Sequence, residues 1–382
     1  MFRSTDVMKI VVAIDKFKGS ATSRQLCDAI EEVINQNCAG IEVLKVPLAD
    51  GGDGTMQAIK QLLGDRCKEC YVLVPGCLEC LPPVEAHYLL DDKSATAYMD
   101  LATASGLALV PDGERDVMNA STIGTGVMIA HAIENGAQSI VLGLGGSATC
   151  DGAMGILAAL GCEFQDAYGN VLRSCGGNLS LIDHIDSQRL SQSVRDVHFT
   201  LLTDVDNPLL GDNGAAAVYA PQKGASPRQV IELESGLRNL SRKLPKDVAS
   251  MLGAGAAGGV AAGMVAMLDA VISPGVDFVL ELSDFDNLIA DAQLIITGEG
   301  RIDEQTMMGK APAGVLRAAR RHMVPAIALC GSLDRDADVD EMGFVEVIEV
   351  TPKNVPLQEA MNTSTTLSLV KKSVLSLLTR IL

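Results

Sequence analysis

The chain has 382 residues, of which 48% are hydrophobic and 20% are charged, as is ordinary for a folded protein. This length exceeds the size at which one hydrophobic core usually divides, so we expect two domains. The formal net charge is −18 and no stripe of Lys or Arg is visible, which excludes a protein that binds nucleic acid through phosphate contacts.

Strands and helices alternate from the start of the chain. Residues 9–14 are a short apolar run rich in β-branched residues, which predicts a buried parallel strand. Thr22 and Gln25 form a capping box, which predicts a helix that ends near residue 35. A strand at 41–47 and a helix that ends at Gly64 follow. This order is typical of a doubly wound parallel sheet.

The same alternation returns twice further along the chain. The predicted elements are helices at 122–135, 153–160, 312–321 and 365–381, and strands at 139–142, 293–297, 326–329 and 345–350. Two other stretches differ from this rhythm. Residues 72–99 resemble short antiparallel strands, and residues 164–272 mix strand and helix without a regular order.

We therefore predict an α/β fold with a Rossmann- or flavodoxin-like parallel-sheet domain and a second, inserted α/β domain that carries a mixed sheet. The first domain is predicted to consist of residues 1–66, 118–165 and 290–382. The second is predicted to consist of residues 67–117 and 166–289.

Two segments invite other interpretations. The uncharged segment 248–268 is long enough to span a membrane, but it consists mostly of Ala and Gly and is flanked by acids, so we predict a buried helix. The N-terminal residues lack the apolar run of a signal peptide, so we expect a cytoplasmic protein with no membrane partner.

The spacing of four cysteines matches a zinc-ligand pattern. They are Cys67, Cys70, Cys77 and Cys80. The stretch between the two pairs resembles a strand, which would hold the pairs about 17 Å apart. We therefore favour two separate pairs over one structural zinc site.

Turns rich in glycine, lysine or aspartate follow several predicted strands, where ligands bind in open parallel sheets. Lys16 and Lys18 follow the first strand and are candidates for an anion clamp, although a solvated lysine pair is the alternative. The second turn, residues 49–55, contains Asp50, Gly51, Gly52 and Asp53. Its backbone N–H groups could cradle an anion, and an Asp there could hold Mg²⁺ or accept a proton.

The turn at residues 143–152 predicts a phosphate nest. It offers Gly145, Gly146, Ser147 and Asp151 immediately before a predicted helix. The P-loop pattern does not occur in the chain. Another glycine pattern, at residues 253–258, fits the dinucleotide fingerprint, but no strand is predicted before it, so a nicotinamide site is disfavoured.

Two further segments supply carboxylates. Asp204 and Asp206 are predicted to alternate on a strand that ends at a proline, where they suit metal or general-base chemistry. An Asx turn is the alternative for that segment. In the second segment, Glu299 and Asp303 could hold a metal, and Arg301 could bind a phosphate or carboxylate. Lys310 lies just beyond these residues.

Phosphate nests, several carboxylates and a few cations in one acidic α/β protein are what Mg²⁺-dependent phosphoryl transfer requires. The segments also resemble, in this order, those of the bacterial glycerate kinase family. The matching stretches are DKFKGS, PLADGGDGT, ASGLALVP, TIGTGVMI, GLGGSATCDGAMG, TDVDNPL, APQKGA, GAGAAGG, ITGEGRIDEQT and GKAP.

The resemblance implies two α/β domains with the active site in the cleft between them, and transfer of the ATP γ-phosphoryl group to D-glycerate, with 2-phosphoglycerate favoured as product. It implies ATP and Mg²⁺ as cofactors, and a homodimer is the assembly that we would test. A catalytically silent hydroxy-acid-binding module on the same scaffold is the alternative. Asp50, Asp204, Lys16 and Arg301 are the expected catalytic residues, and Glu299 and Asp303 the expected metal ligands. The expected substrate or phosphate ligands are Lys18, Gly51, Gly52, Asp53, Gly145, Gly146, Ser147, Asp151 and Lys310.

Overall fold

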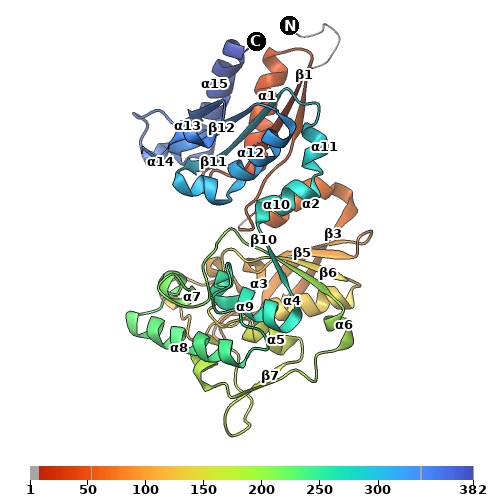
Figure 1. Ribbon diagram of the computed structural model, residues 1–382, viewed down its shortest axis with the longest axis vertical. Helices are drawn as coiled ribbons and strands as arrows, with labels where there is room; N and C mark the ends of the chain where they lie inside the picture. Colours follow the sequence, from red (N-terminus) through yellow and green to blue (C-terminus); the bar gives the residue numbers. More distant parts are fainter. Residues whose placement is uncertain (1–7, 53, 336–337, 382) are drawn as a thin grey trace. The chain divides into compact units, whose positions relative to one another are not determined.

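The structure is a computed structural model that describes residues 8–52, 54–335 and 338–381 (Figure 1). It divides into two compact units. Unit 1 comprises residues 8–50, 57–62 and 274–381, and unit 2 comprises residues 51–56 and 63–273. Unit 2 is therefore inserted in the sequence of unit 1, and each unit has its own hydrophobic cores.

Unit 1 contains a sheet of five parallel strands. Their spatial order is β13 (Glu346–Glu349), β12 (Ala326–Leu333), β11 (Leu294–Ile302), β1 (Met8–Ile14) and β2 (Ile41–Lys45). Numbered along the chain within the unit, this order is 2-1-3-4-5, which is that of flavodoxin-like folds. The order reverses between β1 and β11, so the switch point of the sheet lies between these two strands.

Helices cover both faces of this sheet. Ile10, Val12 and Ile14 of β1 belong to a core that includes α1 (Ser23–Asn37) and α15 (Thr363–Ile381). Val11 and Ala13 belong to the opposite core, which is formed with α10 (Gly275–Leu282), α11 (Phe285–Ile289) and α12 (Ala311–His322). This alternation follows from the two-residue period of a strand. The remaining unit 1 helices are α13 (Val339–Met342) and α14 (Leu357–Ala360); α2 (Thr55–Leu63) is divided between the units.

Unit 2 contains a mixed sheet of six strands. In spatial order they are β10 (Val271–Ser273), β9 (His198–Leu202), β6 (Ser139–Gly143), β5 (Thr96–Asp100), β4 (Val84–Asp91) and β3 (Cys67–Val74). The first four are parallel, and β4 and β3 continue the sheet in antiparallel fashion. A separate antiparallel pair is formed by β7 (Glu163–Gln165) and β8 (His184–Asp186).

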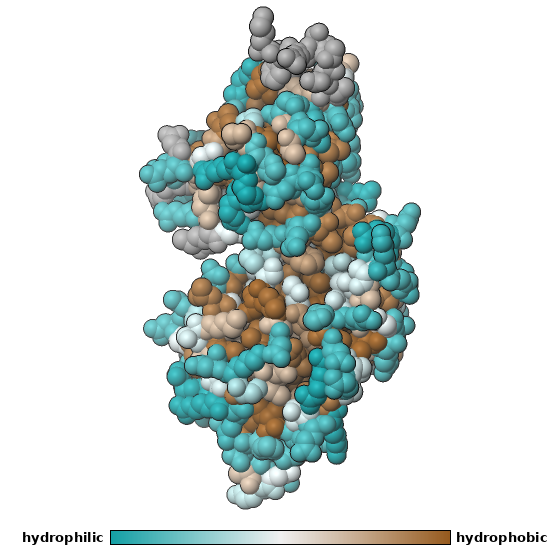
Figure 2. Space-filling view, turned by 45° about the vertical axis from the view of Figure 1, so that its right-hand side comes forward, coloured by the Kyte–Doolittle hydropathy of each residue, from teal (hydrophilic) through white to brown (hydrophobic). Residues whose placement is uncertain are grey.

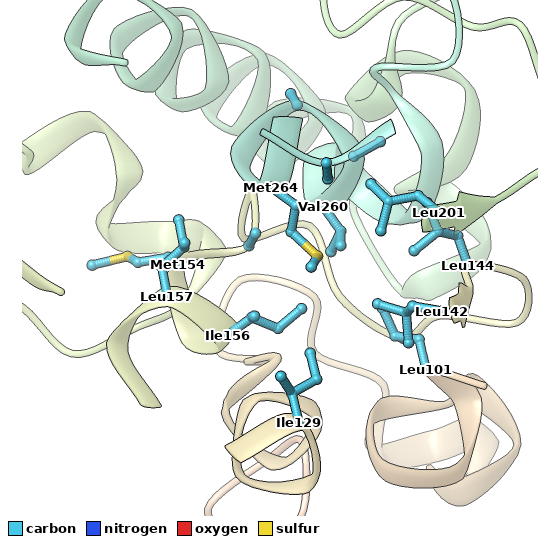
Figure 3. Close-up of a cluster of buried hydrophobic side chains, with 14 of the residues drawn as sticks. Leu101, Ile129, Leu142, Leu144, Met154, Ile156, Leu157, Leu201, Val260 and Met264 are labelled. Carbon is cyan, nitrogen blue, oxygen red and sulfur yellow. The ribbon is translucent and has the colours of Figure 1, made fainter. Parts of the chain in front are cut away.

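One large core holds unit 2 together. Its helices are α3 (Ala102–Ser105), α4 (Ile123–Glu134), α5 (Met154–Ala159), α6 (Gln192–Arg195), α7 (Ala215–Tyr219), α8 (Pro227–Lys243) and α9 (Ala256–Leu268). Figure 3 shows Met264 of α9 and Ile129 of α4 extending toward Ile156 of α5, with Leu142 and Leu201 of the sheet nearby. All of these side chains are fully buried.

The predicted fold class is confirmed, but the predicted domain bounds differ from the two units. Residues 51–56 and 63–66 were assigned to the parallel-sheet domain but belong to unit 2, and two longer stretches also differ. Residues 118–165 were assigned to the parallel-sheet domain, whereas their strand β6 pairs with β5 and β9 in the sheet of unit 2. Residues 274–289 were assigned to the second domain, whereas α10 and α11 pack in a core of unit 1. A buried parallel strand looks the same in either sheet, because its pairing is decided by distant residues.

A local signal gave the start of α1 correctly. Thr22 is the N-cap of α1 and its side chain accepts a hydrogen bond from Gln25 N at 3.2 Å, while the Gln25 side chain accepts one from Thr22 N at 2.9 Å. The capping box is therefore present as predicted. The helix predicted within 248–268 is α9, and it is buried. Among the described residues, no helix is long and apolar enough to cross a membrane. Hydrophilic and hydrophobic residues are interspersed on the face seen in Figure 2.

The buried carboxylate of Asp91 fixes the turn between β4 and β5. Asp91 is fully buried, and its Oδ2 accepts hydrogen bonds from Arg66 Nη2 at 2.6 Å and Ser94 Oγ at 3.0 Å. Its Oδ1 accepts one from Lys93 N at 3.0 Å. Burial raises the pKa of Asp91, but these hydrogen bonds outweigh burial and hold the pKa below its ordinary value.

Replacing Asp91 by Ala is expected to lower the free energy of unfolding by about 2 kcal/mol, because the turn loses the hydrogen bonds that the buried carboxylate accepts from Arg66, Lys93 and Ser94. The measurement is denaturant unfolding. Asp92→Ala is the matched control, since Asp92 is exposed and pairs only at the surface with Lys68. Equal unfolding midpoints for the two variants would contradict the prediction.

Candidate active site

The candidate site of unit 1 lies at the carboxyl ends of β1 and β11, at the switch point of the sheet. Asp15 directly follows β1, and its backbone N–H donates to Gly298 O of β11 at 3.0 Å. Glu299 is the next residue of β11. In open α/β sheets, ligands bind outside the carboxyl ends of the strands at such a switch point. The polar groups of these two strands are therefore the first to consider.

Two carboxylates surround the lysine that follows β1. Lys16 Nζ donates to Asp50 Oδ1 at 3.1 Å and lies 3.8 Å from Asp15 Oδ1. Burial raises the pKa of Asp15 to about 7, Lys16 partly offsets this effect, and the charges of Asp50 and Glu299 add to it. The structure thus brings the predicted Lys16 and Asp50 together and adds Asp15, which was not predicted as a site residue.

Glu299 is a buried carboxyl group held in place by one hydroxyl. Its exposed fraction is 9%, and its Oε1 accepts a hydrogen bond from Thr306 Oγ1 at 2.6 Å. The Thr306 hydroxyl oxygen in turn accepts one from Asp303 N at 3.0 Å. Burial raises the pKa of Glu299 to about 7; Thr306 and Lys310 oppose this effect, and the charges of Asp303 and Asp50 add to it. Glu299, Asp303, Asp50 and Asp15 therefore interact as one acidic group.

Two predicted cations pair with acids of the same unit. Lys310 Nζ donates to Asp303 Oδ1 at 3.3 Å. Arg301 pairs with Asp334 and lies 3.9 Å from Asp303 Oδ2, and its side chain is 63% exposed. Arg301 is therefore available at the surface to an anionic ligand, whereas Lys310 is only partly exposed. Lys18 is exposed in the turn after β1.

The donor set suits a hard divalent cation. Buried carboxyl groups whose pKa values are raised lack sufficient positive charge around them, and carboxylate oxygens are the ligands of Mg²⁺. Within residues 8–52, 54–335 and 338–381, no three His, Cys, Asp or Glu side chains are arranged to hold a metal by themselves. Mg²⁺ is commonly bound by one or two carboxylates together with substrate phosphates, which is compatible with Glu299 and Asp303.

In unit 2, the turn after residue 50 meets the predicted phosphate nest. Gly51 O accepts a hydrogen bond from Gly145 N at 3.4 Å. Gly51 has a φ of +91°, and a Cβ there would lie 2.9 Å from the backbone of Leu202, so a side chain would not fit. Gly52 O accepts from the Thr55 hydroxyl at 2.7 Å at the start of α2. The predicted Asp53 lies outside the described residues.

A buried lysine anchors the nest. Lys223 Nζ donates to Ser147 Oγ and to Thr149 O, each at 2.7 Å, and its exposed fraction is 3%. Burial lowers the pKa of Lys223 to about 8, and nearby Cys150 and Asp151 oppose this shift. Ser147 follows Gly146, which is exposed and has a φ of +70°. Lys223 lies in the APQKGA stretch that carries part of the family resemblance, but it was not predicted as a site residue.

Asp151 was predicted as a ligand-binding residue, but its side chain is buried inside unit 2. It is fully buried, and its Oδ2 accepts hydrogen bonds from Thr122 N and Thr122 Oγ1, both at 2.8 Å, and from Gly155 N at 3.2 Å. Burial raises the pKa of Asp151, and these hydrogen bonds oppose the shift. The carboxyl group therefore connects the nest to Thr122, the residue before α4. We propose that Asp151 stabilises the shape of the nest and does not contact the ligand.

The segment with Asp204 and Asp206 is not a strand, which corrects the prediction. Strand β9 ends at Leu202, and both acids lie in the irregular segment that follows, where they are exposed. The charge of Asp204 contributes to the raised pKa of Tyr219, after burial, so Asp204 lies near that phenol. Asp204 still follows the carboxyl end of a parallel strand, as a ligand-binding residue would.

The remaining sequence patterns have structural roles. Cys67 and Cys70 lie on β3, Cys77 is buried and Cys80 is exposed, and all four thiols are free. The glycine pattern at 253–258 leads into α9, where residues 257–259 have left-handed backbone angles. A Cβ on Gly258 would lie 2.2 Å from Thr149 O, so this glycine permits α9 to pack on the nest.

Comparisons with known proteins agree with this architecture. The model of the glycerate kinase family matches residues 10–379. A glycerate kinase of Halalkalibacterium halodurans is 42% identical over 92% of this chain and 93% of its own length. The glycerate 2-kinase of Escherichia coli is 38% identical over 92% of this chain and 93% of its own length.

A solved structure extends the likeness to the fold. The crystal structure of a Salmonella typhimurium LT2 protein described as a glycerate kinase 2 is 36% identical, covers 98% of this chain and 99% of its own, and aligns with a TM-score of 0.84. The match of the family model across nearly the whole chain, together with these identities, shows that the chain belongs to the glycerate kinase family of enzymes.

Proposed function

We propose that the chain transfers the γ-phosphoryl group of ATP to the 2-hydroxyl group of D-glycerate and releases ADP and 2-phosphoglycerate. The observation that carries the proposal is the group of buried carboxyl groups beside Lys16 and Lys310, at the switch point of the unit 1 sheet. The chain's membership of the glycerate kinase family indicates the reaction in which this group would take part. The identity to the glycerate 2-kinase of Escherichia coli supports the 2-hydroxyl as acceptor. Use of ATP supports a cytoplasmic location.

The reaction exchanges one P–O bond for another. A bond forms between the glycerate 2-oxygen and the γ-phosphorus while the bond from that phosphorus to the β,γ-bridging oxygen breaks, and ADP leaves. The hydroxyl proton passes to a carboxylate, either Asp50 or Asp204, and then to solvent. Such a transfer depends mainly on positioning and on neutralising charge.

The cations and carboxylates of unit 1 have distinct proposed roles. Lys16 and Arg301 neutralise anionic oxygens of the two substrates, and Lys310 adds positive charge beside Asp303. Glu299 and Asp303 hold Mg²⁺, which when bound neutralises phosphate charge during transfer. Thr306 orients the Glu299 carboxyl through its 2.6 Å hydrogen bond. The exposed Lys18 adds positive charge at the surface of unit 1.

In unit 2, backbone N–H groups and one hydroxyl group are the proposed hydrogen-bond donors to an anion. They belong to Gly51, Gly52, Gly145, Gly146 and Ser147.

The test is turnover of ATP with D-glycerate and Mg²⁺, followed by ³¹P NMR of the product. We expect ADP and 2-phosphoglycerate in equal amounts. A 3-phosphoglycerate signal would change the acceptor hydroxyl and keep the kinase. Binding of glycerate with no ADP release in the presence of any hydroxy acid would favour the silent binding module. Light scattering on the same sample tests the expected homodimer.

The base is identified by comparing two variants. Asp50→Asn or Asp204→Asn, whichever removes the proton acceptor, is expected to lower kcat by about 10²- to 10⁴-fold and to abolish the acid limb of the pH–rate profile. The other variant is expected to keep that limb. Asp206→Asn is the matched control for Asp204→Asn, since both acids are exposed in the same segment. Intact acid limbs in both catalytic variants would exclude both residues as the base.

A further inference from the structure

The buried Lys223 forms no ion pair with a carboxylate in the part of the chain that the structure describes, which is unusual for a buried ammonium group. No Asp or Glu among the described residues forms an ion pair with it, and its hydrogen-bond partners are the neutral Ser147 Oγ and Thr149 O. A buried charge is costly unless an opposite charge or several hydrogen bonds offset the cost. The site therefore lacks a negative charge that a bound ligand could supply.

The hydrogen bond from Lys223 leaves the Ser147 hydroxyl group free to act as a donor. An ammonium group has three donors and no acceptor, so Ser147 Oγ must accept the bond from Lys223. The hydroxyl proton of Ser147 is then directed elsewhere, and no residue in the described part of the chain accepts it. A bond from a cation also polarises the hydroxyl group and strengthens it as a donor. Ser147 is thus held as a donor for an acceptor that is not part of the protein.

The surroundings of Ser147 fit a negatively charged oxygen. Ser147 is 6% exposed and directly follows the exposed Gly146 in the same turn. Thr149 Oγ1, fully buried in the same turn, has no hydrogen-bond partner in the described structure. Among the described residues, the carboxylate whose charge acts on Lys223 is that of Asp151; its Oδ2 accepts hydrogen bonds from Thr122 and Gly155, and its Oδ1 has no hydrogen-bond partner. Burial raises the pKa of Cys150 to about 12, so this thiol stays neutral.

We propose that Ser147 donates a hydrogen bond to an oxyanion of a substrate, and that Lys223 is the positioning residue that fixes the direction of that bond and supplies the charge behind it. The ligand chemistry is an oxyanion, either the carboxylate of the hydroxy acid or a phosphate of the nucleotide. This assignment rests on the proposed function and deepens it, because it names the group that selects an anionic substrate and a residue that acts through another side chain.

The test measures binding rather than turnover, so that it does not depend on the proposed reaction. Isothermal titration calorimetry gives the Kd values of D-glycerate and of ADP separately for the native protein, Ser147→Ala, Lys223→Met and the double variant. Ser147→Ala removes a single oxygen atom. It is expected to raise the Kd of one of the two ligands by at least 10-fold and that of the other by less than 2-fold. The weakened ligand identifies the source of the oxyanion.

The double variant separates positioning from structural support. If Lys223 acts through Ser147, Lys223→Met raises the Kd of the same ligand. The double variant then raises this Kd by less than the product of the two single fold-changes. Ser147→Thr, which keeps the hydroxyl group, should recover most of the lost affinity. Unfolding midpoints are measured alongside, and if Lys223→Met does not fold, Ser147→Ala and Ser147→Thr still decide the result.

Two results would overturn the inference: an unchanged ratio of the two Kd values in Ser147→Ala, or affinities in Ser147→Thr as low as in Ser147→Ala. Failure of the proposed function is recognised separately. If the native protein releases no ADP with D-glycerate but Ser147→Ala still loses affinity for one anion, the proposed oxyanion site is supported and the proposed kinase activity is rejected. If the native protein turns over and Ser147→Ala binds both ligands normally, the kinase stands and the oxyanion site does not.

Discussion

Replacing Glu299 by Gln is expected to lower kcat for ATP and D-glycerate by about 10²- to 10³-fold and to leave unit 1 folded. Gln has the shape of Glu and can still accept the 2.6 Å hydrogen bond from Thr306, but it carries no negative charge for a divalent cation. The loss should therefore appear in kcat and in the apparent affinity for Mg²⁺. Steady-state kinetics over a range of Mg²⁺ concentrations checks both quantities.

The stability of the same variant should change in the opposite direction. The pKa of Glu299 is about 7 in the folded chain, above its ordinary value near 4.5, because burial disfavours the charged form. A raised pKa contributes stability that is complete at low pH and is lost as the pH rises through 7. Without Mg²⁺ and nucleotide, Glu299→Gln should therefore gain stability relative to the native protein between pH 5 and pH 8.

The control for this pair of measurements is Glu42→Gln on β2. Glu42 is exposed in the same unit, so its replacement should change neither kcat nor the pH dependence of unfolding. A kcat of Glu299→Gln close to that of Glu42→Gln would exclude Glu299 from the reaction. A lower stability of Glu299→Gln at pH 8 would show instead that the charged form is stabilised in the fold, against the argument from burial.

The contrast between Glu299 and Lys223 shows which parts of a site can be found in a sequence. Glu299 follows an apolar run that could only be a buried strand, and the carboxyl end of a parallel strand is a known place for ligands. Lys223 lies in a short 3₁₀ turn, 76 residues from Ser147. Its burial depends on the packing of a distant turn, and a single lysine in a polar segment usually indicates a solvated side chain.

Pairing between distant strands was the part of the fold that local patterns did not determine. The capping box at Thr22 acts within four residues, and for that reason the start of α1 was predicted correctly. Strand β6 has the same apolar pattern as β1, yet it lies in the other sheet between β5 and β9. Asp15 was overlooked for a related reason, since an acid next to Lys16 resembles a surface pair until its burial is known.

A second large effect is expected for Gly258→Ala, which should destabilise unit 2 by more than about 3 kcal/mol and abolish turnover. Gly258 has a φ of +69°, where Ala is strained, and a Cβ would lie 2.2 Å from Thr149 O and 2.6 Å from Cys150 Cα. Both neighbours are backbone atoms of the nest and cannot rotate away. The measurement is thermal unfolding, in which the midpoint should fall by roughly 6–12 °C.

Gly169→Ala separates backbone strain from this steric conflict. Gly169 has a φ of +83°, similar to that of Gly258, but a Cβ at this position would have no atom of the described structure within 4 Å. The control variant therefore incurs only the conformational cost of a left-handed Ala, about 1 kcal/mol. Equal midpoints for the two variants would mean that α9 can move off the nest without loss of stability.

The activity of Gly258→Ala then tests whether the nest must keep its shape. The Thr149 carbonyl oxygen that would collide with the new Cβ is also an acceptor of the Lys223 ammonium group, at 2.7 Å. If it is displaced, Lys223 loses a partner and the direction of the Ser147 hydroxyl is no longer fixed. At a temperature where the variant is still folded, turnover should be lost while Gly169→Ala remains active. Native turnover in folded Gly258→Ala would show that α9 supports the fold of unit 2 but does not shape its anion site.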